Sequence, residues 1–154
     1  MEFLLLLTAK DKEILDLVYK ARFSVEENTP LCLLGKKFFG FLKTRQKTVV
    51  ICTRNAQDLA VNPISTNDHG NENYQTAFYI RRALRHEAVH VAQMCNNGKV
   101  ISSAGKNKFK LHPFKETALK GSTKISGNEK KEYEAYWMED KPNLVISALK
   151  KYCL

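Results

Sequence analysis

The sequence predicts an α+β fold in which a small sheet packs on one long helix and a second, polar helix follows. Three observations favour this class: an uninterrupted helical pattern over residues 74–95, two short β-rich runs before it, and further helical segments after a lysine-rich connection. The chain has 154 residues, of which 44% are hydrophobic and 27% are charged. That size and balance predict a single domain over residues 1–154.

The first third of the chain is expected to supply one helix and two strands. The apolar run at residues 3–7 is expected to be a buried strand or the start of a helix. Apolar residues then recur at helical spacing over residues 11–23, which predicts an amphipathic helix. Residues 38–42 and 48–53 are rich in aromatic and β-branched side chains, and the polar stretch between them predicts a hairpin or two adjacent strands.

Turn-forming residues mark both ends of the long helix. Residues 62–73 are dense in Asn, Asp, Ser, Gly and Pro, which predicts a loop before the helix. Asn96, Asn97 and Gly98 tolerate left-handed backbone conformations, so the helix is expected to end there.

The last third of the chain is expected to hold a long connection and two helices. Residues 99–127 should form a partly irregular connection in which residues 108–111 could form a short strand. Asn128 is the predicted cap of a helix that continues to a break at residues 141–142, where a proline follows a lysine. The final helix is expected over residues 143–152.

The motif His86-Glu87-Ala88-Val89-His90 lies in the middle of the long predicted helix. Residues four apart on a helix lie about 40° from the same face, so the two imidazoles point at a common position that suits Zn²⁺. Glu87 lies about 100° around the helix, where it can reach a metal-bound water without binding the metal. The motif predicts one Zn²⁺ per chain, with Glu87 as the general base. The alternative is a helix whose two histidines and glutamate are solvated or paired with each other.

A catalytic zinc site of this kind needs a third protein ligand and one open position. Gln93 and Asn96 stand where the metzincin pattern requires Gly and His, which excludes that arrangement. The second predicted helix offers Glu132 and Glu134 as candidates, and Glu139 shares a face with Glu132 and could support the site from behind. For all three glutamates, a solvated acidic helix face is the alternative.

The motif and the downstream sequence Glu-Tyr-Glu-Ala-Tyr at residues 132–136 resemble the gluzincin group of zinc metallopeptidases over residues 74–140. In that group a Glu on a second helix, often in a pattern Glu-x-x-Ala, completes the site. The resemblance implies a zincin-like fold, in which the sheet packs on the motif helix, and implies Glu132 as the third ligand. This sequence departs from the group's pattern at Tyr136, where the group often has a polar residue that supports a ligand histidine.

These features predict a zinc-dependent metallopeptidase that hydrolyses peptide bonds with a metal-activated water and Glu87 as general base. One alternative is a catalytically inactive zincin-like protein that binds partners through a basic surface. Another is a peptidase whose only substrate is one partner. His112, between the two ligand-bearing helices, is expected to be a surface loop histidine, although it could stabilise an oxyanion or bind the metal.

The chain is strongly basic, with 25 Lys and Arg against 16 Asp and Glu and a net charge of +9. Residues 99–131 carry nine lysines and two glutamates, and Arg81, Arg82 and Arg85 could add positive charge beside the cleft. This charge could steer an acidic peptide, a nucleic-acid-associated substrate or an anionic membrane surface, or it could equally serve solubility. Specific nucleic-acid recognition is not expected, because no pattern of base-stacking aromatic residues accompanies the lysines.

Four cysteines, Cys32, Cys52, Cys95 and Cys153, form no Cys-x-x-Cys pair. They are expected to be reduced, buried thiols, with two disulfides as the alternative. The N-terminus lacks the positive region of a signal peptide, and no apolar run reaches the roughly 18 to 20 residues of a membrane span. A cytoplasmic protein is therefore expected, and the sequence leaves its oligomeric state open.

Overall fold

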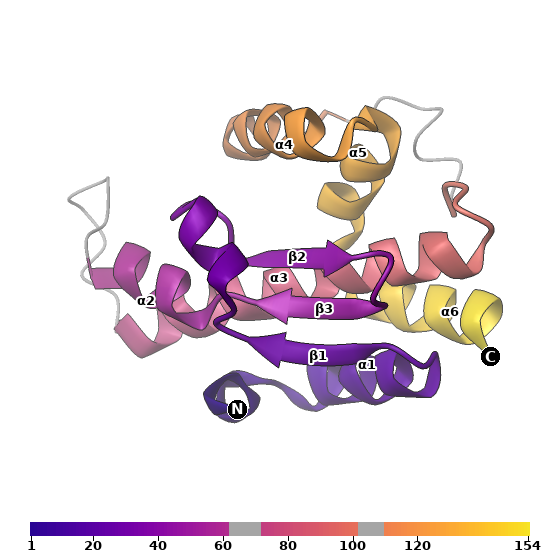
Figure 1. The fold of residues 1–154 in the computed structure, drawn as a ribbon, viewed down its shortest axis with the longest axis horizontal. Helices are drawn as coiled ribbons and strands as arrows, with labels where there is room; N and C mark the ends of the chain where they lie inside the picture. Colours follow the sequence, from indigo (N-terminus) through magenta and orange to yellow (C-terminus); the bar gives the residue numbers. More distant parts are fainter. Residues whose placement is uncertain (62–71, 102–109) are drawn as a thin grey trace.

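A computed structural model describes residues 1–61, 72–101 and 110–154 of the protein. These residues form an α+β fold with a mixed sheet of three strands, six α-helices and two short 3-10 helices (Figure 1). The elements in chain order are η1 Glu2–Leu6, α1 Ala9–Lys20, β1 Ser24–Glu27, η2 Pro30–Leu34, β2 Gly40–Lys43, β3 Thr48–Ile51, α2 Thr53–Val61, α3 Glu72–Cys95, α4 Pro113–Ser126, α5 Glu129–Met138 and α6 Pro142–Cys153.

The sheet has the strand order β1-β3-β2. The central strand β3 pairs in parallel with β1, with Val25 opposite Val49, and antiparallel with β2, with Phe41 opposite Val50. All four residues of β3 are buried, and its composition of Thr, Val, Val and Ile fits a central strand. Among the described residues, the outer edge of β2 pairs with no strand. This edge matters for the site, because β2 forms one wall of the cleft described below.

Helix α3 is the central element of the core and passes behind the sheet in Figure 1. Ile80, Leu84 and Val91 on α3 are fully buried, together with Val18 of α1 and Leu149 of α6. Packing on several sides keeps α3 in place, so side chains in its middle can be positioned accurately. Within the described ranges, none of the helices combines the length and apolar character needed to cross a bilayer.

Several predicted elements are confirmed. The long helix ends at Cys95, and Asn97 and Gly98 adopt left-handed φ angles of 54° and 73° directly after it. The two β-rich runs form the antiparallel pair β2 and β3. Asn128 caps α5 by accepting a hydrogen bond from the backbone N–H of Lys131.

Residues 113–126 form the helix α4, so the prediction of an irregular connection there is wrong. His112 caps its first turn by accepting a hydrogen bond from the Phe114 backbone N–H, Pro113 occupies the first turn, and Gly127 ends the helix with a φ angle of 70°. One internal glycine costs a helix only about 1 kcal/mol, which these end signals and packing on α5 outweigh. Residues 110 and 111 form no strand, and residues 62–71 and 102–109 lie outside the described part of the chain.

Two further elements, β1 and α2, are absent from the sequence-based prediction. β1 has the polar sequence Ser-Val-Glu-Glu, and it is a strand because its backbone pairs with β3. α2 begins at Thr53, one residue after Cys52, which follows the end of β3. The predicted strand over residues 48–53 is therefore two residues too long. Both elements depend on tertiary neighbours rather than on a strong local pattern.

The expectation of reduced cysteines is also wrong, because all four form disulfides. Cys32 pairs with Cys52 and Cys95 pairs with Cys153, with Cα atoms 5.5 and 5.1 Å apart. The partners are 20 and 58 residues apart in sequence, so their proximity arises only in the folded chain.

Candidate metal centre

His86 and His90 on α3 meet Glu132 of α5 at one position. One ligand atom from each of these three side chains lies within 4.8 Å of the other two. The two Nε2 atoms are 3.2 Å apart, Glu132 Oε2 is 3.3 Å from His86 Nε2, and Glu132 Oε1 is 3.5 Å from His90 Nε2. The structure therefore brings together the three residues that the sequence singled out as metal ligands.

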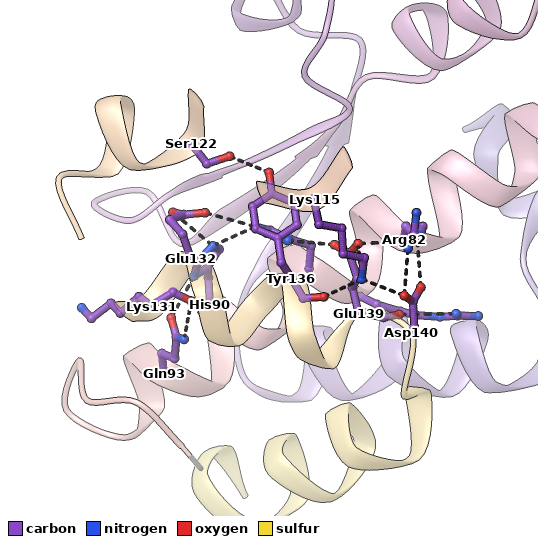
Figure 2. A network of polar contacts seen from close by, with 12 residues as sticks. Arg82, His90, Gln93, Lys115, Ser122, Lys131, Glu132, Tyr136, Glu139 and Asp140 are labelled. Carbon is purple, nitrogen blue, oxygen red and sulfur yellow. Dashed lines mark hydrogen bonds and ion pairs between the residues drawn. The ribbon is translucent and has the colours of Figure 1, made fainter. Parts of the chain in front are cut away.

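The other ring nitrogen of each histidine is held by a buried acceptor. His86 Nδ1 donates to Glu139 Oε2 at 3.0 Å. His90 Nδ1 donates to Gln93 Oε1 at 2.8 Å (Figure 2). Gln93 has a defined orientation, because its Nε2 donates to the carbonyl of Lys131 and to Glu134. Its oxygen must then face His90, which places the proton of a neutral His90 on Nδ1 and the lone pair on Nε2.

This donor set fits a metal ion. With protons on both Nδ1 atoms, two nitrogen lone pairs and a carboxylate point at one another, an arrangement that a cation stabilises. Two imidazole nitrogens and one carboxylate oxygen are ligands that Zn²⁺ binds readily. Hard cations such as Mg²⁺ prefer oxygen ligands and suit the site less well.

The pKa shifts show how the site is balanced without a metal. Burial alone would lower the pKa of His86, but hydrogen bonds to Glu132 and Glu139 and the charge of Glu87 outweigh it and raise the pKa to about 10. Burial alone would raise the pKa of Glu132, but hydrogen bonds with His86 and His90 hold it well below its usual range. A proton on His86 therefore occupies the role that a metal cation would take, and metal binding would release it.

Glu87 of α3 lies beside the three ligands and against Gly40, the first residue of β2. The Glu87 side chain is buried, and burial raises its pKa in spite of the nearby His86 and His90. Gly40 of β2 lies directly against it: a Cβ atom at that position would be 3.0 Å from Glu87 Cγ and 3.1 Å from Glu87 Oε1. The missing side chain at Gly40 gives Glu87 the space that it occupies.

The ligands and Glu87 line a cleft of about 530 Å³ whose walls are β2, α3, α4 and α5. His86, Glu87, His90 and Glu132 form its polar floor. Its other walls combine the apolar side chains of Phe38, Phe41, Leu42, Met94 and Ile125 with polar ones, among them Thr44, Ser122, Ser126, Asn128 and Lys131. A polar group can therefore lie on the floor while apolar side chains contact the walls.

A network of charged groups lies behind His86 and holds Glu139 in place. Lys115 of α4 donates to Asp140 Oδ2 at 2.7 Å and lies 3.1 Å from Glu139 Oε1 (Figure 2). Arg82 of α3 donates to Asp140 at 2.7 Å and lies 3.5 Å from Glu139. Burial would raise the pKa of Asp140, but these two cations outweigh it and hold the pKa well below its usual range. The network keeps a carboxylate in position against His86 Nδ1.

Tyr136 stands where the gluzincin pattern often has a polar residue supporting a histidine. Its ring packs edge-on against His86, with centroids 4.4 Å apart, and its hydroxyl shares a hydrogen bond of 2.7 Å with Ser122. The polar support comes instead from Glu139, one helical turn further along the chain.

Other residues considered from the sequence lie away from the metal position. Glu134 is fully buried and accepts hydrogen bonds from Gln93 and from the Ile101 backbone N–H at 2.9 Å. Glu134 thus supports the His90 side of the site through Gln93 rather than serving as a ligand. His112 is an exposed residue at the start of α4.

The arginines of α3 fasten other elements to this helix, so the idea that they flank the cleft is wrong. Arg81 donates to the carbonyl of Leu6 at 2.6 Å, and Arg85 donates to the buried Asp11 at 2.7 Å. Arg82 binds Asp140, as described above. None of the three is among the described residues that line the cleft.

Sequence reasoning missed Gln93, Gly40 and Lys115. Gln93 follows His90 by three residues and therefore shares its helix face, a spacing that could have indicated its role. Gly40 and Lys115 carry no such signal, because only the packing of β2 and α4 brings them to the site.

Fold and site together define an α+β protein with a candidate metal centre formed by two helices. Residues 3–154 match the family described as "Domain of unknown function (DUF8637)", and the chain belongs to this family. No curated protein and no solved structure matches the chain.

Proposed function

We propose that this protein is a zinc-dependent metallopeptidase with a zincin-like fold. One observation carries the proposal: His86, His90 and Glu132 converge on one position at the floor of a cleft, with Glu87 beside them. The arrangement supplies three protein ligands, a general base and room for a substrate, the parts that metal-assisted hydrolysis requires.

A zinc ion in this site would lower the pKa of a bound water and polarise the carbonyl of the scissile peptide bond. Glu87 then accepts the proton of the attacking water and transfers it to the leaving amine nitrogen. The burial of Glu87 favours both proton transfers. It raises the pKa of the carboxyl group towards the working pH, where the group can accept a proton from water and donate it to the amine.

Within the described part of the chain the outer edge of β2 pairs with no strand, and this supports a peptide as the substrate. An edge strand presents unpaired N–H and C=O groups, and an extended peptide can satisfy them by adding as a further strand. Gly40 and Phe41 of β2 line the cleft, so a peptide bound along this edge passes over Glu87. Phe38 and Phe41 in the walls can contact an apolar side chain of the substrate, and Lys131 is a cation at the cleft that could contact an acidic residue.

The two disulfides bear on where the enzyme works. Such bonds persist in oxidising compartments and are rare where glutathione and thioredoxin keep thiols reduced. The pairs Cys32–Cys52 and Cys95–Cys153 therefore favour an oxidising environment over the cytoplasm that the sequence suggested.

Metal content is the first test. Elemental analysis of the purified protein should find about one Zn²⁺ per chain, lost in His86→Ala and reduced in Glu132→Ala. Glu129→Ala is the matched control, because Glu129 is exposed on the first turn of the same helix. Wild-type protein that holds no zinc even after reconstitution would overturn the proposal.

Turnover is the second test. Zinc-loaded wild type and Glu87→Gln are incubated with a peptide library, and cleavage products are identified by mass spectrometry. Glu87→Gln should keep its zinc and lose nearly all cleavage, since the amide cannot accept the proton. Zinc-loaded wild type that cleaves no peptide in the library would favour a catalytically inactive zincin-like binding protein instead.

A further inference from the structure

Two neighbouring leucines project from η2 into solvent. Leu33 and Leu34 are 84% and 80% exposed. They end the short purple helix that precedes β2 in Figure 1, at the end of the sheet next to α2. Single exposed leucines are ordinary on protein surfaces. Transfer of a leucine side chain out of water contributes about 1.5 to 3 kcal/mol, so covering an adjacent exposed pair would stabilise a complex.

The segment that carries these leucines is firmly held. Cys32, directly before them, is disulfide-bonded to Cys52 at the end of β3. The buried amide of Asn55 donates to three backbone carbonyls on both sides of the leucines, those of Cys32, Gly35 and Phe38, at 3.0, 3.2 and 2.8 Å. The leucines therefore face outward on a fixed base and cannot readily fold back into the core.

The surroundings of the pair are positively charged. Residues 28–57 contain six basic residues and no acidic one. Of the six, Lys43, Arg45 and Lys47 lie around the β2–β3 turn at the other end of the hairpin. The other three are exposed at this end of the sheet: Lys36 and Lys37 follow the leucines after Gly35, and Arg54 lines the same small hollow as Leu33. Exposed aliphatic side chains flanked by cations suit the boundary of an anionic bilayer, where acyl chains and lipid phosphates lie a few ångströms apart.

We propose that η2 docks this protein onto an anionic lipid bilayer. Leu33 and Leu34 enter the boundary between headgroups and acyl chains, while Lys36 and Lys37 contact the lipid phosphates. A bilayer fits better than a protein partner, because a stable protein interface buries about 800 Å² on each side, far more than two leucines supply. Phe38, four residues after Leu34, lines the cleft, so docking brings one end of the cleft near the bilayer.

Vesicle flotation tests the proposal. Purified full-length protein should float with vesicles of phosphatidylcholine and phosphatidylglycerol, should not float with phosphatidylcholine alone, and should bind more weakly in high salt. The double variant Leu33→Ser/Leu34→Ser should lower the partition coefficient at least about tenfold. Leu5→Ser is the matched control, because Leu5 is 90% exposed on η1 and its removal should leave binding unchanged.

A second measurement reports on insertion itself. In Leu34→Trp, the tryptophan fluorescence should shift to shorter wavelength on anionic vesicles, and brominated acyl chains should quench it. Trp137, the one native tryptophan, contributes a background that wild type measures and that is subtracted. Thermal unfolding of each variant checks that it is folded.

Three results would overturn the proposal. Wild type could fail to bind anionic vesicles. Binding could survive in the double leucine variant, which would mean electrostatic adsorption alone. Wild type could also form a dimer that the double variant dissociates while neither binds vesicles, which would make η2 a contact between copies. All of these readouts are independent of zinc and turnover, so they leave the proposed peptidase activity untouched.

Discussion

The protons on His86 and His90 are placed by residues that do not touch the metal position. Glu139 and Gln93 accept from the two Nδ1 atoms, which turns both Nε2 lone pairs towards Glu132. Such partners fix the ring orientation and raise the basicity of a ligand histidine, so their removal weakens a metal site even when all ligands remain.

Glu139→Ala is expected to lower the zinc affinity by about 10- to 100-fold, because His86 loses the acceptor for its Nδ1 proton. Competition with a chromogenic chelator measures the affinity. Asp140→Ala is the control, since Asp140 binds the same Lys115 and Arg82 but does not contact His86. Equal losses in both variants would show that the network acts by packing α4 and α5, rather than by orienting His86.

Gly40→Ala should disturb Glu87 without disturbing the metal. The added Cβ would lie 3.0 Å from Glu87 Cγ, so the carboxylate must shift. The shift needed is a few tenths of an ångström, less than the ~1 Å misplacement that can cost about 100-fold, so kcat is expected to fall by about three- to tenfold while zinc content stays at the wild-type level. Gly121→Ala is the comparison, because nothing lies within 4 Å of its new Cβ; it should keep full activity and gain about 0.5 to 1 kcal/mol of stability. Wild-type kcat in Gly40→Ala would contradict the role given to Glu87.

At the scale of secondary-structure elements, the motif helix is held to its neighbours by covalent and charged contacts as well as by its apolar face. The Cys95–Cys153 disulfide joins the end of α3 to α6, and Cys32–Cys52 joins η2 to the end of β3. Arg82 and Lys115 join α3 and α4 to Asp140, just after α5. The elements that carry the ligands are therefore fixed from outside the site.

The two disulfides should contribute unequally to stability. Loop-closure entropy predicts a loss of about 4 kcal/mol in Cys95→Ala/Cys153→Ala and about 3 kcal/mol in Cys32→Ala/Cys52→Ala, because the first pair spans 58 residues and the second 20. Urea unfolding of each variant measures the difference. A larger loss from the shorter loop would mean that strain or residual structure in the unfolded chain, rather than loop length, decides the effect.

Asp140 should stabilise the fold in a pH-dependent way. Its pKa in the folded protein is lowered, so its contribution is fully present above the unfolded value of about 3.9 and disappears as the pH falls through the lower folded value. Asp140→Asn is expected to cost about 1 kcal/mol at pH 7, after allowance for solvent screening, and nothing at strongly acidic pH. Urea unfolding of wild type and Asp140→Asn across this pH range measures the difference in their free energies of unfolding. A difference that does not change with pH would exclude ionisation of Asp140 as its cause.

At the scale of the whole molecule, the proposed metal would link two parts that are far apart in sequence. Its ligands lie on α3 and α5, separated in the chain by α4 and by residues 102–109. A metal that binds only the folded arrangement stabilises the entire fold, because unfolding must separate the ligands.

Zinc should therefore raise the free energy of unfolding. At about 100 times its Kd, the ion should add about 2.7 kcal/mol, and a chelator should remove that increase. Thermal unfolding of apo and zinc-loaded protein measures it. His90→Ala should show no zinc-dependent increase, and Mg²⁺ should have no effect on wild type, because two of the three ligand atoms are nitrogens. A zinc effect that persists in His90→Ala would place the stabilising ion elsewhere.

The local features of this protein follow from short-range patterns in its sequence. The helical spacing of His86 and His90, the left-handed residues after Cys95 and the cap at Asn128 all follow from contacts within a few residues, so a pattern could predict them. The choice of Glu132 over Glu134 came only from the resemblance, because the distance of either from the histidines depends on how α5 packs against α3.

The remaining features arise only when distant parts of the chain pack together. This packing makes a strand of the polar β1, pairs cysteines up to 58 residues apart, directs Glu134 into the core and places Gly40 against Glu87. The physical reason is common to all of these features. Each depends on backbone or side-chain partners from a distant part of the chain, and hydrogen bonding and burial with those partners outweigh local preference.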